Sequence, residues 1–300
     1  MKTIKILCAI GITSLLLVGC NKEELPVPSN PVQTDAKPQI RGMASVKGAG
    51  DNGNTLLGNP SSATTSTTNY NNYLMETSYY SLSYSRDRGI PNWVSWHIDT
   101  DDLGTTPRQD DFRSNTTLPT GWYRVSSSSY SGSGFDRGHY CPSADRTSSI
   151  TANSATFLMT NMMPQAPNNN QQTWNSLESY TRSLVTSSGK EVYVVCGSYG
   201  KGGTGSNGGV TTSIDNGKVT VPNRTWKVIV VLDRGTNDLS RISTSTRVIA
   251  VDMPNSNSIS SDWRTYRTTV DAIETATGYN LLTAISTATQ STLEARRDIL

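Results

Sequence analysis

The chain has 300 residues, which is enough for one large domain with its own core. Hydrophobic residues make up 34% and charged residues 17%, both less than globular proteins usually have. The formal charge is +2, and without Lys2 and Lys5 the rest of the chain has equal numbers of basic and acidic residues. The global charge therefore gives no support for nucleic-acid binding, which would need local placement of charge. Because His97 and His139 are the only histidines, the composition also disfavours a zinc site built from several His and Cys.

Residues 1–19 have the order of a bacterial lipoprotein signal peptide. Lys2 and Lys5 precede an apolar run, residues 6–18, which is too short to span a bilayer comfortably. The run ends in Gly19-Cys20, which resembles a lipobox, so we expect Cys20 to be lipidated and to anchor the protein to a membrane. An ordinary secretory signal or a buried apolar segment is the alternative interpretation.

Residues 20–50 are expected to form the lipidated cysteine and a flexible tether. Four prolines and few large apolar residues fall in this stretch. The acidic run at residues 21–24 resembles a surface-export signal, although it would also suit a solvated linker. The expected location is thus the cell envelope, as an outer-membrane lipoprotein that faces either the periplasm or the cell surface. Residues 51–300 remain as the main domain.

Strands and helices are mixed in this domain without a regular βαβ alternation. Residues 79–85 and 93–98 are predicted strands joined by a turn at 86–89. The β-branched runs 191–196, 226–232 and 248–253 are predicted core strands. This pattern indicates the α+β class.

Three helices are predicted in the second half of the chain. Residues 168–185 place Trp174, Leu177, Thr181 and Leu184 on one apolar stripe, and Gly189 is a plausible end. Residues 268–277 form a second predicted helix, before Gly278, and residues 291–298 a short third one.

A histidine with an acid, a base and a glycine beside it stands in the stretch 135–142, FDRGHYCP. The imidazole of His139 can take a proton near neutrality because its ordinary pKa is about 6.5. Arg137 offers a planar fork that suits phosphate oxygens. Gly138 would let the backbone approach a ligand or adopt a positive φ. The stretch is therefore a candidate for acid–base chemistry on a phosphate.

Polar residues at four-residue spacing follow on the first predicted helix. Asn170, Trp174, Glu178 and Arg182 form one slanted row on its surface. An amide oxygen and a carboxylate suit a hydrated Mg²⁺, which prefers few protein ligands and oxygen donors. Taken singly, these residues have structural explanations. Asn170 could cap the helix, Glu178 and Arg182 could be a surface ion pair, and His139 could be a core histidine.

Together the residues are more specific. The DRGH stretch, then Asn161-x-x-Pro-Gln, then Asn170-x₃-Trp-x₃-Glu-x₃-Arg, resembles the DNA/RNA non-specific endonuclease family, the ββα-metal nucleases that include endonuclease G. Weaker similarity extends over roughly residues 51–290. The resemblance implies a central antiparallel sheet flanked by helices. It also implies an endonuclease that hydrolyses DNA and RNA, single- or double-stranded, to products with a 5′-phosphate.

The resemblance also implies roles for individual residues. His139 would be the general base, and Asn170 would bind one Mg²⁺ directly, with Mn²⁺ as a possible substitute. Glu178 would hold the ion through water. The remaining implied site residues are two arginines that stabilise charge on the phosphate and two residues that position the site: Arg137, Arg182, Asn161 and Asp136.

For the two cysteines of the main domain, and for His97 and Arg108, the sequence gives less specific expectations. Cys141 stands where the family more often has a small residue. Because Cys141 and Cys196 are the only cysteines of the main domain, a disulfide between them is expected in an oxidising compartment, with two buried free thiols as the alternative. His97 is expected to be structural, and Arg108 to be a solvated surface residue.

Two rival functions stay open at this point. A phosphodiesterase for small substrates would use the same residues, because cleft shape sets substrate size. A catalytically inactive surface lipoprotein that binds nucleic acid is the rival from another class. The complete set of His139, Asn170 and Glu178 argues against it, because a decayed site is expected to lose at least one of them.

Overall fold

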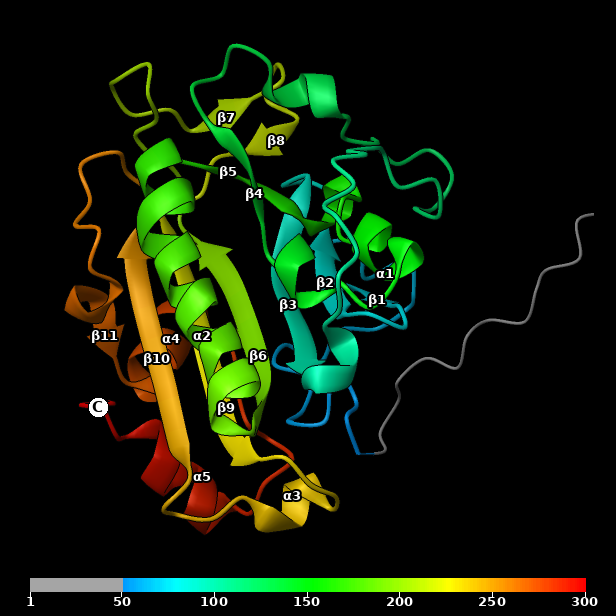
Figure 1. Ribbon diagram of the computed structural model, residues 1–300. Coiled ribbons are helices and arrows are strands. Elements are labelled where there is room, and N and C mark those ends of the chain that lie inside the picture. Colours follow the sequence, from blue (N-terminus) through cyan, green and yellow to red (C-terminus); the bar gives the residue numbers. More distant parts are fainter. Residues whose placement is uncertain (1–50) are drawn as a thin grey trace, which may run out of the picture. The chain divides into compact units, whose positions relative to one another are not determined.

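A seven-stranded sheet forms the centre of the domain (Figure 1). The computed structural model describes residues 51–300, so the predicted leader, Cys20 and the tether lie outside the described residues. Every pair of neighbouring strands is antiparallel. In spatial order the strands are β1 (Tyr73–Glu76), β2 (Ser81–Ser85), β3 (Ile90–Ile98), β6 (Lys190–Tyr199), β9 (Arg224–Asp233), β10 (Arg247–Pro254) and β11 (Arg267–Thr268).

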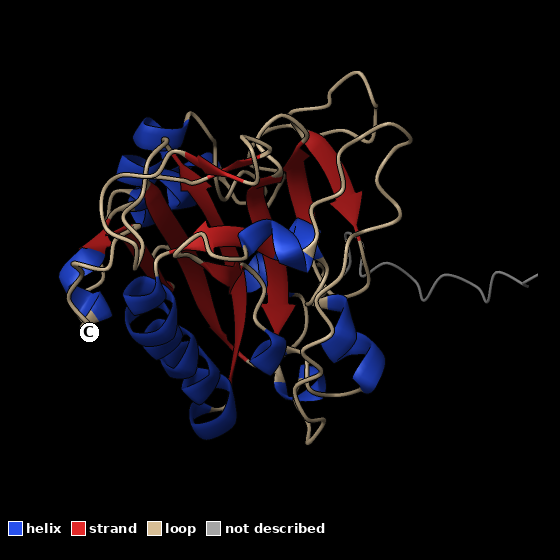
Figure 2. Ribbon diagram, turned by 90° about the horizontal axis from the view of Figure 1, so that it is seen from above, coloured by secondary structure: helices blue, strands red, loops and turns tan. Residues whose placement is uncertain are grey.

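Helices cover both faces of this sheet (Figure 2). On one face lies α2 (Asn175–Ser188), whose Leu177 and Val185 pack in one core cluster with Val194 of β6. On the other face, α4 (Val270–Thr277) and α5 (Thr287–Glu294) pack in a second cluster with β9. Because the central strands are buried on both faces, their sequences are continuous apolar runs rather than alternating ones.

A small pair of strands lies beside the main sheet and leads into α2. β4 (Asp136–His139) pairs antiparallel with β5 (Met162–Gln165), with His139 opposite Met162. The connection between them contains α1 (Ile150–Ala155). The other short elements are β7 (Ser213–Ile214), β8 (Val219–Thr220), α3 (Asp238–Arg241), the 3₁₀ turns Thr100–Asp102, Ser127–Tyr130, Ser143–Asp145, Met159–Asn161 and Trp263–Tyr266, and the π-helical segment Asn169–Trp174.

The π-helical segment runs directly into α2, so the predicted helix is present but begins in a wider coil. The apolar stripe from Trp174 to Leu184 is buried as predicted. Gly189 ends the helix in the left-handed conformation, with a φ of 64°, which a glycine adopts without a steric penalty.

The α+β class and the antiparallel sheet flanked by helices are confirmed, while several element boundaries differ, among them those of β3 and of the last helix. β3 starts at Ile90, earlier than predicted, because Ile90 and Pro91 also pair with β2, beyond a register shift at which Asn92 of β3 is skipped. The last helix covers Thr287–Glu294 and not 291–298. Asp298 instead accepts hydrogen bonds from Arg247 of β10 at 2.8 and 2.9 Å, which holds the chain end outside the helix.

The expected disulfide is wrong. Cys141 and Cys196 are both buried free thiols. The Cys196 thiol donates instead to the backbone carbonyl of Tyr140, at 3.7 Å. Burial raises the pKa of both thiols, which keeps them protonated and unreactive. Within residues 51–300, no helix is long and apolar enough to cross a membrane.

Candidate active site

A polar pocket lies between β4 and the helical segment that leads into α2. It has two adjoining parts, with volumes of about 320 and 420 Å³, and Arg108, Arg137, Asn170 and Gln171 line both. We call the whole the β4–α2 pocket. The smaller part is lined by Arg108, Arg137, His139, Pro142, Ser143, Ala144, Asn170, Gln171, Asn175, Glu178 and Arg182.

The alternation of side chains along β4 sends Arg137 and His139 to the same face, which is the pocket side. At Gly138, between them, a side chain would face away from the pocket. A Cβ atom there would lie 2.2 Å from Oε1 and 2.6 Å from Cβ of Gln165 on β5. Close packing against Gln165, and not a positive φ, therefore requires this glycine.

His139 is buried between two aromatic rings. Its ring lies 5.6 Å from Phe112 and 5.1 Å from Phe157, centroid to centroid. Its Nε2 is buried without a hydrogen-bond partner. Burial, together with the smaller effect of the charges on Arg108 and Arg137, lowers the pKa of His139 to about 3. The imidazole is thus neutral at neutral pH, in the form that can accept a proton.

Asn161 is fully buried and holds the chain just beyond β4. Its Oδ1 accepts from the backbone N–H of Cys141 at 3.0 Å, and its Nδ2 donates to the carbonyl of Cys141 at 2.8 Å. Its own carbonyl accepts from the N–H of Tyr140 at 3.0 Å. Asn161 therefore fixes the backbone directly after His139 and does not line the pocket.

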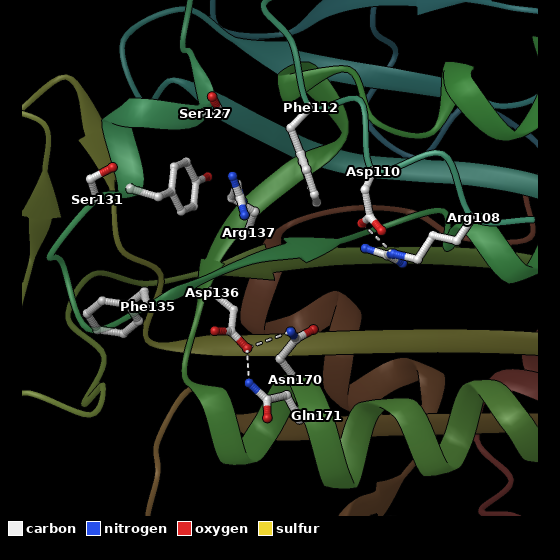
Figure 3. A pocket seen from close by; sticks show the side chains of 11 residues that line it. Arg108, Asp110, Phe112, Ser127, Ser131, Phe135, Asp136, Arg137, Asn170 and Gln171 are labelled. Carbon is white, nitrogen blue, oxygen red and sulfur yellow. Dashed lines mark hydrogen bonds and ion pairs between the residues drawn. The ribbon is translucent and has the colours of Figure 1, made fainter. Parts of the chain in front are cut away.

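Asp136 orients the amide of Asn170 (Figure 3). One carboxylate oxygen, Oδ2, accepts from Asn170 Nδ2 and from Gln171 Nε2, each at 2.8 Å. With its nitrogen turned to Asp136, Asn170 has its amide oxygen available for another partner. This arrangement gives Asp136 a definite task that its place in the sequence did not reveal.

Glu178 and Arg182 lie one helical turn apart on the pocket side of α2. Burial raises the pKa of Glu178, and the positive charges of Lys227 and Arg182 oppose this rise. The guanidinium of Arg182 donates to the buried Asp145 at 3.0 Å, and the indole of Trp96 donates to the other oxygen of Asp145, also at 3.0 Å. Glu178 and Arg182 are therefore members of one charge network.

Lys227 belongs to this network but was not predicted from the sequence. Its Nζ lies 3.5 Å from Glu178 Oε1 and 4.1 Å from the centre of the Trp174 ring, and its side chain is buried. A signal was present, since Lys227 is the only charged residue in the apolar run 226–232. A lone charge in a core strand indicates a buried partner.

Arg108 was expected to be only a solvated surface residue. It is about half exposed, at 49%, but lines both parts of the pocket. Its guanidinium donates to Asp110 at 2.6 Å and to Ser143 at 2.9 Å, and it lies 4.8 Å from the centre of the Phe157 ring. Nothing in its sequence neighbourhood distinguishes it, because only the fold brings its loop to β4.

Oxygen donors and a neutral base thus share one pocket with several arginines. Asn170 Oδ1 and the Glu178 carboxylate are the groups that suit a hydrated Mg²⁺. Among the described residues, Arg137 forms no ion pair, and its guanidinium rests 4.1 Å from the centre of the Phe112 ring. The predicted site residues are therefore gathered at one place, with Asn161 behind them as support.

The β4–β5 pair followed by α2, with this pocket between them, is the architecture of a ββα nuclease. The family model for DNA/RNA non-specific endonucleases matches residues 57–288, and the chain belongs to this family. It is therefore a hydrolase of the nuclease class.

Relatives and a solved structure agree with this assignment. A nuclease of Nostoc sp. is 46% identical over 291 residues, which cover 96% of this chain and 97% of that protein. Human mitochondrial endonuclease G is 43% identical over 90 residues, or 30% of each chain. The crystal structure of an EndoG/EndoGI complex matches with a TM-score of 0.62 at 24% identity, over 78% of this chain and 91% of that one, which shows a shared fold.

Proposed function

We propose that the β4–α2 pocket hydrolyses phosphodiester bonds of both DNA and RNA, with His139 as the general base and one hydrated Mg²⁺ as cofactor. The observation that carries the proposal is the shared pocket. It brings a neutral, buried imidazole together with an oriented amide oxygen, a carboxylate and two arginines that face the same space.

His139 takes a proton from the attacking water, whose oxygen forms a bond to phosphorus. The bond from phosphorus to the 3′ oxygen breaks, so the products carry a 5′-phosphate and a 3′-hydroxyl. Arg137 and Arg182 bind the phosphate oxygens and stabilise the charge that they gain in the transition state. Asp136 keeps the Asn170 amide turned into the pocket, and Asn161 keeps the end of β4 in place.

Asn170 Oδ1 would bind the ion directly, and Glu178 would hold it through water, with Mn²⁺ able to replace Mg²⁺. When bound, the ion would polarise the phosphate and stabilise the departing 3′ oxygen. Lys227 and Arg182 favour the ionised form of Glu178 against the cost of burial, which this role needs.

Substrate breadth follows from the kind of groups in the pocket. Its charged and amide groups suit one phosphate and one ion, which carry no sequence information. Backbone contacts that tolerate a 2′-hydroxyl would let RNA be cut as well as DNA. This part of the proposal is supported by membership of a family whose description names both substrates.

The metal role can be tested with Asn170→Ala beside Gln172→Ala. Gln172 lies on the same helical segment, is exposed and does not line the pocket. Asn170→Ala is expected to require far more Mg²⁺ or Mn²⁺ for plasmid cleavage, while Gln172→Ala keeps the wild-type titration curve. Fragments should accept a 5′ label from polynucleotide kinase only after phosphatase treatment. Equal metal titrations for the two variants, or fragments that accept the label directly, would contradict the mechanism.

We also propose that the protein is exported and anchored to the outer membrane through Cys20. The support is the order of charge, apolar run, small residue and cysteine in residues 1–20. In cells fed labelled palmitate, the wild-type chain should take up label and sediment with membranes. Cys20→Ala should take up no label. A wild-type chain that stays unlabelled would refute the anchor and leave the nuclease proposal untouched.

A further inference from the structure

A second group of potential metal ligands lies outside the β4–α2 pocket. His97 near the end of β3, Asp99 just beyond it and Glu191 near the start of β6 are all buried, and each offers a ligand atom within 4.8 Å of the others. None of the three lines the pocket. Since β3 and β6 are neighbours in the sheet, an ion here would join them where β3 ends.

Three ligand-type atoms of this group are buried without a hydrogen-bond partner. They are Nδ1 and Nε2 of His97 and Oε2 of Glu191, in side chains that are fully buried. Buried polar atoms are nearly always satisfied, so such a cluster indicates that a partner belongs between them. The other oxygen of Glu191 is already paired with Arg241, which leaves Oε2 facing His97.

The spacing of these atoms fits a tetrahedral ion. His97 Nε2 lies 3.4 Å from Glu191 Oε2. Two ligands about 2.0–2.1 Å from a tetrahedral Zn²⁺ lie roughly 3.3 Å from each other. On the far side of the ring, Nδ1 lies 3.8 Å from Asp102 Oδ2. A carboxylate behind a metal-binding imidazole is the usual partner that orients such a ligand.

The charge around the group has the sign that a cation needs. Three arginines pair with five carboxylates in this network. The arginines are Arg146, Arg234 and Arg241, and the carboxylates are Asp99, Asp101, Asp102, Glu191 and Asp238. Carboxylates therefore outnumber arginines among the ion pairs around His97.

We propose that His97, Asp99 and Glu191 hold a structural divalent transition-metal ion of the zinc type, separate from the ion of the nuclease reaction. One imidazole nitrogen and two carboxylate oxygens suit Zn²⁺ better than Mg²⁺ or Ca²⁺, which favour sites built only from oxygen. The ion would cross-link β3 and β6 and the turn that follows β3, and it would stabilise the sheet without taking part in catalysis.

The test uses the full chain with Cys20→Ala, stripped with EDTA and then given Zn²⁺ alone or Mg²⁺ alone. Bound metal is measured by elemental analysis after gel filtration, and thermal unfolding is followed in parallel. We expect one tightly bound Zn²⁺ per chain. With Zn²⁺ about 100-fold above its Kd, the Tm should rise by on the order of 5 °C, and Mg²⁺ should not reproduce this.

Matched variants locate the ion. His97→Gln should lose both the bound Zn²⁺ and the rise in Tm, whereas His139→Gln and Asn170→Ala, which alter the pocket, should keep them. If His97→Gln does not fold, Asp99→Asn replaces it, and the wild-type measurement still decides. A wild-type chain that retains no Zn²⁺ would overturn the proposal. Loss of Zn²⁺ from Asn170→Ala but not from His97→Gln would also overturn it.

Discussion

His139 should make the protein less stable as the pH falls below 7, and His139→Gln should remove this effect. The pKa of His139 is about 3 in the folded chain and about 6.5 when unfolded. Between these two pKa values the unfolded state therefore binds a proton at His139 and the folded state does not. The stability that the neutral imidazole contributes is fully present above pH 6.5 and is lost as the pH falls toward 3. Between pH 7 and pH 5 the loss is about 2 kcal/mol.

Urea unfolding of wild type and His139→Gln at pH 7 and pH 5, in EDTA, measures this quantity. The change in the free energy of unfolding between the two pH values is compared, so that other titrating groups cancel. Wild type should lose about 2 kcal/mol more than the variant. Equal losses would refute the claim that burial and two arginines keep His139 neutral.

Three other perturbations test separate parts of the site. Gly138→Ala should cost about 1–3 kcal/mol of stability and most of the activity, because the new Cβ would overlap a side chain of β5; urea unfolding and plasmid cleavage measure the two effects. Lys227→Met should lower stability by about 3–5 kcal/mol, because it leaves a buried carboxylate without its cation, while adding Glu178→Gln to it should recover part of the loss. Because Cys141 and Cys196 are free and buried, dithiothreitol should leave the Tm unchanged, and a thiol reagent should react with these two residues only after unfolding.

Each of these predictions has an outcome that contradicts it. A fully active and stable Gly138→Ala would show that β4 and β5 are not closely packed there. A Lys227→Met variant as stable as wild type, or one whose stability Glu178→Gln does not partly restore, would contradict a stabilising ion pair between Lys227 and Glu178. A Tm that falls in dithiothreitol would indicate that Cys141 and Cys196 form a disulfide after all.

The sequence was informative where structure is local. The apolar stripe of α2 and its glycine end depend on residues a few positions apart, and both were predicted. The central strands were found because they are continuous β-branched runs. The four-residue strand β4 was not predicted, since its partner β5 is more than twenty residues away and the pairing depends on tertiary context.

The candidate site likewise contains residues that local spacing predicted and residues that only the fold brings together. The spacing of Asn170, Glu178 and Arg182 on one helix predicted that they share a face, and they line one pocket. Arg108 and Lys227 come from a loop and from β9, and only the fold brings them to that pocket or its charge network. An even number of cysteines favoured a disulfide, but pairing needs proximity and orientation, which a count does not contain.

The most direct measurement is cleavage of supercoiled plasmid and single-stranded RNA by wild type and His139→Ala, in Mg²⁺ and in EDTA. Both proteins comprise residues 21–300, without the apolar leader and Cys20, so that they stay in solution. Wild type should degrade both substrates in Mg²⁺ and neither in EDTA, and His139→Ala should be slower by roughly 10²–10⁴-fold on both. Cleavage by His139→Ala at the wild-type rate, or intact nucleic acid in every lane with the plasmid still shifted on a gel, would contradict the account.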